Sequence, residues 1–166
     1  MAHKFHSLNF RNKKVGNSLI YRNRKFEFVN CQYADFGENI LFENCIFDET
    51  VVFGSELSNQ AFCSIHKDLI FNNCIFKKQV LLDGVVCNAH IIFKNCKFNY
   101  KSKNIYDYAL SISNANVKIG IELAECHFVG GINFSATIIE RVGCLFHHTI
   151  IDNKECGLNF DSAEFG

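Results

Sequence analysis

The sequence repeats the pattern Phe-x-Asn-Cys-x-Phe three times: FENCIF at residues 42–47, FNNCIF at 71–76 and FKNCKF at 93–98. Each copy places two phenylalanines five residues apart and a cysteine two positions before the second one. A pattern that recurs along one chain is typical of repeat proteins, in which each repeat forms one structural unit. The cysteine in it serves either chemistry or packing, and the fold decides between them.

The spacing of large apolar residues extends this pattern over most of the chain. Steps of five and six residues alternate and close a cycle of 22, as in Phe71, Phe76, Leu82, Cys87, Phe93 and Phe98. The same steps join Ile112, Val117, Leu123, Phe128, Phe134, Ile139, Leu145 and Ile150. Neither a helix nor a long strand has this period. It predicts short strands, four to a coil, that each point one large side chain inward.

Two interruptions of the spacing predict insertions at corners of the coils. About seven extra residues fall within 54–64, and the stretch NYKSKNIYDYAL at 99–110 adds eight more. The spacing resumes after each interruption, and solenoids tolerate such insertions.

A small residue two positions before a large one defines the repeating unit. It occurs as CIF at 45–47 and 74–76, CKF at 96–98, CHF at 126–128, ADF at 34–36 and AEF at 163–165. Over roughly residues 28–166 the chain resembles the pentapeptide-repeat family, although that family steps by five throughout. The resemblance implies a right-handed, four-sided fold. We therefore expect an all-β, right-handed parallel β-helix (solenoid) of about six coils of roughly 22 residues, with corner insertions.

Charge divides the chain into two parts. Residues 1–25 carry seven of the 17 basic residues and no acid, which leaves 10 bases against 17 acids, a balance of −7, from residue 26 onward. Residues 1–25 also lie outside the spacing described above. We expect them to form a basic N-terminal arm that folds across the first coil as a cap, with residues 26–166 forming the β-helix domain.

The repeated cysteines are predicted to serve packing. The spacing predicts one interior column of stacked cysteines, Cys45, Cys74, Cys96 and Cys126. Beside it, the spacing predicts a column of Phe47, Phe76, Phe98 and Phe128. A cysteine acts there as a small apolar residue. Parallel thiols stacked about 4.8 Å apart do not form the tetrahedron that zinc requires. They also do not face each other as a disulfide needs. We expect no metal, no cofactor and reduced thiols.

The asparagine before each of three cysteines is predicted to lie at a corner of the solenoid. Asn44, Asn73 and Asn95 hold this position, and Glu125 replaces asparagine in the next coil. Asparagine tolerates the left-handed backbone of a tight turn. Stacked amides can also form hydrogen bonds along the axis.

No catalytic constellation stands out, and we expect a protein that is not an enzyme. The chain has neither a Gly-rich phosphate loop nor a His-Glu-x-x-His motif. Cys144, His147 and His148 are close enough in sequence for a Cys–His nucleophile pair. Cys144 adjoins the predicted inward Leu145, however, so we expect it outside the core or at a corner.

Two places are candidates for binding. The second insertion carries Tyr100, Lys101 and Lys103, and Lys94 and Lys97 lie just before it. Basic and aromatic residues together can bind nucleic acid. A solvated loop is the plainer interpretation, so a nucleic-acid partner is not expected. The last predicted strands of the solenoid carry Phe160 and Phe165 at a sheet edge without a neighbouring strand. We expect either a second copy, in a two-fold homodimer, or further sequence to cover it.

Three hypotheses for function follow. The first is a non-catalytic interaction or scaffold module with an unidentified protein partner. The second comes from the resemblance: quinolone-resistance members of the family mimic DNA and bind type II topoisomerases, and residues 119–166 hold seven acids against Arg141 and Lys154. The third is a soluble domain of a larger membrane or signalling protein. No signal peptide or apolar run long enough for a membrane span is visible, which favours a cytoplasmic location.

Overall fold

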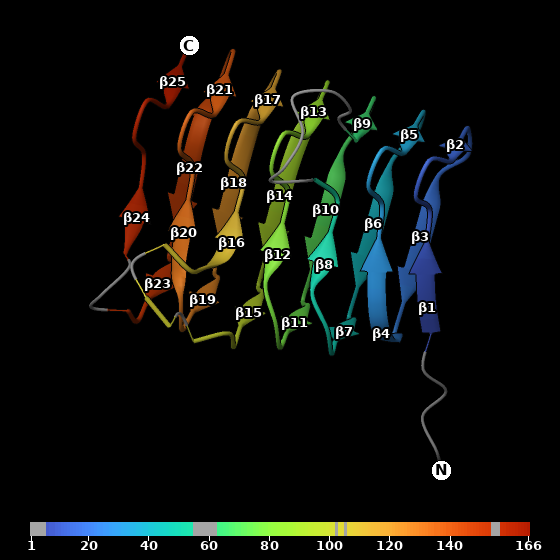
Figure 1. The fold of residues 1–166 in the computed structure, drawn as a ribbon, viewed down its shortest axis with the longest axis horizontal. Coiled ribbons are helices and arrows are strands. Elements are labelled where there is room, and N and C mark those ends of the chain that lie inside the picture. The colour runs from blue at the N-terminus through green and yellow to red at the C-terminus, as the bar shows by residue number, and fades with distance from the viewer. Residues whose placement is uncertain (1–5, 55–62, 102, 105, 154–156) are drawn as a thin grey trace.

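The computed structural model describes residues 6–54, 63–101, 103–104, 106–153 and 157–166. These residues form short strands that pair only in parallel. Coils stack along the long axis of the molecule, from β1, β2 and β3 at one end to β22–β25 at the other (Figure 1). The predicted all-β parallel solenoid is confirmed. No helix that could cross a membrane occurs in the described part of the chain.

Each coil contributes a strand to each of four faces. Face 1 contains β1 (His6–Asn9), the end of β4 (Lys25–Asn30), β8 (Val51–Val52), β12 (Val80–Leu81), β16 (Tyr108–Ser111), β20 (Gly131–Asn133) and β24 (Leu158–Asn159). Face 2 contains β2 (Lys14–Val15), β5 (Asp35–Phe36), β9 (Ser64–Ile65), β13 (Val86–Cys87), β17 (Asn116–Val117), β21 (Ile138–Ile139) and β25 (Glu164–Phe165).

The other two faces complete the coil. Face 3 contains β3 (Leu19–Arg22), β6 (Ile40–Glu43), β10 (Leu69–Asn72), β14 (His90–Lys94), β18 (Gly120–Ala124) and β22 (Gly143–His147). Face 4 contains the start of β4, then β7 (Ile46–Phe47), β11 (Ile75–Phe76), β15 (Lys97–Phe98), β19 (His127–Phe128) and β23 (Ile150–Ile151). Strand β4 pairs with both β7 and β8, which joins faces 4 and 1 into one sheet.

Columns of stacked phenylalanines fill the interior. Phe71 lies between Phe42 and Phe93, with ring centroids 5.0 and 4.9 Å apart, and its own ring is nearly parallel to both. Phe76 lies in the neighbouring column and meets Phe71 edge to face at 5.4 Å. Parallel contacts within a column and perpendicular contacts between columns are both favourable for aromatic rings. One large side chain per face therefore closes the core, as the spacing predicted.

The asparagine corner also follows the prediction. Asn44, Asn73 and Asn95 all have a left-handed backbone, with φ between 51° and 54°, and Glu125 has φ 55° in the same place. The amide of Asn73 donates to Asn44 Oδ1 at 2.7 Å, and the amide of Asn95 donates to Asn73 Oδ1 at 3.4 Å. These side chains form a hydrogen-bonded ladder along the outside of the coil.

The expected N-terminal cap over residues 1–25 is corrected by the structure. From residue 6 onward this segment forms the first coil, and β1, β2 and β3 pair in parallel with β4, β5 and β6. The steps Phe10, Val15, Tyr21, Phe26 keep the five–six–five spacing. The step from Phe26 to the buried Cys31 is five residues instead of six. Because of this shorter step, the spacing did not reveal the first coil. Residues 1–5 lie outside the described part.

The last full coil departs from the predicted register by one residue. Phe146 pairs with Leu123, whereas the predicted inward Leu145 is 50% exposed. Ile150 is likewise exposed, and Ile151 takes its place beside the core. One extra residue between β21 and β22 causes the shift. Gly143 absorbs it with a left-handed φ of 84°, which glycine adopts without steric cost.

Candidate interaction surfaces

The cysteine column is a closed packing feature. Cys45, Cys74, Cys96 and Cys126 are fully buried. The thiol of Cys74 donates to the carbonyl oxygen of Phe42 in the preceding coil at 3.4 Å, and the thiols of Cys96 and Cys126 bond to the corresponding carbonyls at 3.3 Å. In the next coil the hydroxyl of Thr149 makes the same bond to Leu123 at 2.7 Å. The column thus satisfies corner carbonyls, and a hydroxyl can replace the thiol.

The environment of three further cysteines favours the protonated thiol. Burial raises the pKa of Cys63 to about 12, that of Cys87 to about 11 and that of Cys144 to about 12. A thiol must ionise to act as a nucleophile or metal ligand. The cysteines in the described part of the chain are free thiols. Cys156 falls outside that part.

The Cys144–His147 pair considered from the sequence does not form. Successive residues of a strand point to opposite sides, and on β22 Cys144 packs against the core while His147 is exposed. The expectation that Cys144 lies outside the core is therefore wrong. His147 and His148 contact each other edge to face, with ring centroids 4.2 Å apart. Within the described ranges no three His, Cys, Asp or Glu side chains gather as a metal site.

The insertion after β15 is organised around Asp107. Its carboxylate accepts hydrogen bonds from the Tyr100 hydroxyl at 2.9 and 3.0 Å, from the Lys103 amide at 2.8 Å and from the Gln79 side chain at 3.0 Å. Tyr100 also packs against the core. Its role here is structural, and Tyr106, 82% exposed, is the ring that projects into solvent.

The lysines around this insertion do not share one surface. Lys94 ends β14 on face 3, and Lys97 begins β15 on face 4. Lys101 and Lys103 are exposed on the insertion. The set predicted from the sequence is thus spread over two faces and a loop.

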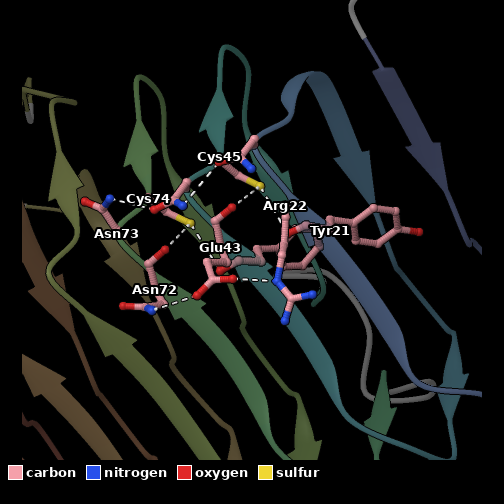
Figure 2. A network of polar contacts seen from close by, with 10 residues as sticks. Tyr21, Arg22, Glu43, Cys45, Asn72, Asn73 and Cys74 are labelled. Carbon is pink, nitrogen blue, oxygen red and sulfur yellow. Dashed lines mark hydrogen bonds and ion pairs between the residues drawn. The ribbon is translucent and has the colours of Figure 1, made fainter.

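The outer side of face 3 carries a row of apolar side chains that was not predicted from the sequence. Ile20, Leu41, Ile70 and Ile92 are aligned by strand register across β3, β6, β10 and β14. Beside it runs a polar row, in which Glu43 accepts a hydrogen bond from Arg22 at 2.6 Å and from Asn72 at 3.4 Å (Figure 2). The signal was present as an apolar residue directly before each inward aromatic ring.

The acids of the last third do not line up along the axis. Glu125 lies at the corner after β18 and Glu140 at the corner after β21. Asp152 follows β23, Asp161 follows β24 and Glu164 is part of β25. All five are exposed, and they ring the last coils instead of forming a strip along the rod.

The C-terminal end of the solenoid exposes aromatic core positions. Phe146, Phe160 and Phe165 are 39%, 37% and 48% exposed, although they continue the interior columns. The Phe160 ring stacks on Phe134 with centroids 5.1 Å apart and meets Phe165 at 5.8 Å. These rings and their neighbours border a shallow, open hollow of about 480 Å³, lined by Val142, Gly143, Cys144, Phe146, Leu158, Phe160, Phe165 and Gly166. We call this set the C-terminal face.

Open backbone edges surround the same hollow. Strands β22, β23, β24 and β25 each end their sheet within the described chain, with a neighbour on one side only. An edge strand presents unpaired N–H and C=O groups that can pair with another chain. The structure therefore combines the two predicted residues, Phe160 and Phe165, with both kinds of contact that strand addition uses.

Comparison with known proteins adds no relative to this description. No protein-family model matches the sequence, and no match was found among curated proteins or among solved structures.

Proposed function

We propose that the chain is a non-catalytic protein-interaction module, a divergent pentapeptide-repeat solenoid that binds protein through its C-terminal face. The observation that supports it most is the exposure of Phe146, Phe160 and Phe165 beside four open strand edges. Exposed aromatic clusters of this kind are typical of interaction sites.

The body of the molecule supports a scaffold role. Stacked rings and hydrogen-bonded ladders leave one continuous core from Phe26 to Ile139. A partner that adds a strand to β22 or β25 extends an existing sheet, with backbone hydrogen bonds for affinity and apolar pockets for specificity. The end hollow of about 480 Å³ offers an apolar surface for the side chains of such a strand.

A comparison of wild type with Phe165→Glu tests the proposal. Both proteins are immobilised and exposed to lysate of the native host, and bound proteins are quantified by mass spectrometry. Glu49→Phe, which adds a ring at an exposed site in an early coil, is the control. We expect partners that the wild type and the control retain and that Phe165→Glu loses. Equal retention by all three proteins would refute the role of this face.

A further inference from the structure

The N-terminal end of the solenoid is a second open end with the opposite charge. Among the described residues, strands β1, β2, β3 and the start of β4 have a neighbour on one side only. A hollow of about 420 Å³ lies there, lined by His6, Leu8, Ile20, Tyr21, Arg22, Arg24 and Phe26. We call this set the N-terminal face. Arg22 and Arg24 are exposed beside it, whereas Asp161 and Glu164 are exposed beside the C-terminal face.

The two halves of a coil follow the same order of residue types. In the fifth coil, faces 1 and 2 have a left-handed residue at Asn114, then a small buried residue, Ala115, and a large one, Val117. Faces 3 and 4 repeat this order eleven residues later with Glu125, Cys126 and Phe128. A half-turn about the solenoid axis therefore brings the corner and inward positions of faces 1 and 2 onto the corresponding positions of faces 3 and 4.

For the strands that the structure describes, a half-turn is the rotation that joins two copies without a gap. The described chain begins on face 1 with β1 and ends on face 2 with β25, two strands into a seventh coil. A second copy placed without rotation would have its β1 above face 1. It would then either leave no strand above β22 on face 3 or overlap with β24 on face 1. A copy rotated by half a turn continues the winding of the solenoid. Its strands β1, β2, β3 and β4 then lie on β22, β23, β24 and β25, respectively.

Side chains match in this register. Phe165 falls over Phe26 of the next copy, and Phe160 falls over Tyr21, so the aromatic columns continue. Asp161 of one copy lies opposite Arg22 of the next. Within one chain, Arg22 already bonds to Glu43 of the neighbouring coil at 2.6 Å, and Asp161 would take the matching place on its other side. Outward pairs of this kind steer association and fix register.

From these observations we propose that the C-terminal face binds the N-terminal face of a second copy, rotated by half a turn, so that copies assemble head to tail. The inference rests on the proposed function and names its partner. Six and a half coils at the strand spacing of about 4.8 Å give an axial rise of about 31 Å per copy. The interface is heterologous, and it builds an open filament.

This arrangement fits better than the two-fold dimer expected from the sequence. A two-fold contact between C-terminal faces brings together two ends that each carry the exposed acids Asp161 and Glu164. It also brings strands together antiparallel in a molecule whose sheets are parallel throughout. Head-to-tail contact pairs acids with bases and keeps every sheet parallel.

Sedimentation of two charge-reversal variants tests the arrangement. The chain is measured from 1 to 200 µM at pH 8 in low salt. We expect the mass to grow with concentration past a dimer, and Arg22→Glu and Asp161→Arg each to weaken association about tenfold. An equimolar mixture of the two variants restores it, because each joint then pairs opposite charges. Lys118→Glu and Glu49→Arg, exposed reversals on inner coils, are the matched controls, and thermal midpoints verify folding.

The outcomes separate the two proposals. Growth that stops at a dimer and is insensitive to Arg22→Glu establishes the two-fold contact and overturns the head-to-tail joint. A wild-type monomer at 200 µM also overturns it. The proposed function then still stands if Phe165→Glu loses a partner from the lysate. Filaments with an axial rise near 31 Å in electron micrographs support the joint.

Discussion

At the scale of single residues, each interior position has a size and a polarity requirement. The cysteine column needs a small side chain that offers one weak donor to a corner carbonyl, as Cys74 does for Phe42 at 3.4 Å. Thr149 and Thr137 fill equivalent positions with hydroxyls that donate to Leu123 and Ile112. Cysteine therefore repeats because it packs well there, and reactivity is not required.

Substitutions at Cys74 test this requirement. Cys74→Asp buries an unpaired carboxylate and is expected to cost several kcal/mol, about 3 or more. Cys74→Ser keeps a donor and Cys74→Ala loses only the sulfur, so each is expected to cost about 1 kcal/mol. Chemical denaturation followed by circular dichroism measures the differences. An aspartate variant as stable as the wild type would contradict the inward assignment.

At the scale of elements, an insertion is held by one carboxylate. Asp107 anchors the segment after β15 through Tyr100, Lys103 and Gln79. Burial, and then the hydrogen bond to Asp107, raises the pKa of Tyr100 above its usual value. Asp107 thus links the described residues of this segment, which contain no strand between β15 and β16.

A pH titration of Tyr100 tests the anchor. A tyrosine whose pKa is raised by folding favours the native state below the unfolded pKa of about 10, and this contribution disappears as the pH rises through the native pKa. We expect Asp107→Asn to move the ultraviolet titration of Tyr100 back toward pH 10 and to increase hydrogen exchange in the insertion. Tyr106→Phe, at an exposed ring, removes one background tyrosine and serves as control. A Tyr100 titration unchanged by Asp107→Asn would rule out the anchor.

At the scale of the whole molecule, coils contact only their neighbours, so the two ends expose what the middle buries. Phe93 is fully buried in the fourth coil, whereas Phe146, in the same column, is 39% exposed in the sixth. The ends are the chemically distinct parts of the rod, and for this reason both proposals concern them.

Metal independence is a prediction for the whole fold. Stability comes from stacked rings and parallel ladders, so treatment with a chelator is expected to leave the far-ultraviolet circular dichroism and the melting curve unchanged. Elemental analysis of untagged protein provides the independent check. Stoichiometric zinc in that protein would contradict the packing role of the cysteines.

The sequence by itself determined the solenoid, because an apolar residue every five or six positions is compatible with one stacked architecture. It also placed the cysteine and phenylalanine columns and the left-handed asparagines, which are local and repeat in every coil. It missed the first coil, where one shortened step after Phe26 interrupts the count, and the register of Phe146, which one extra residue shifts. Only the tertiary structure decided which rings stay exposed and which charges rim each end. Both depend on the number of coils that stack and on the face that carries the last described strand. A local sequence pattern does not contain this information, because it repeats in every coil.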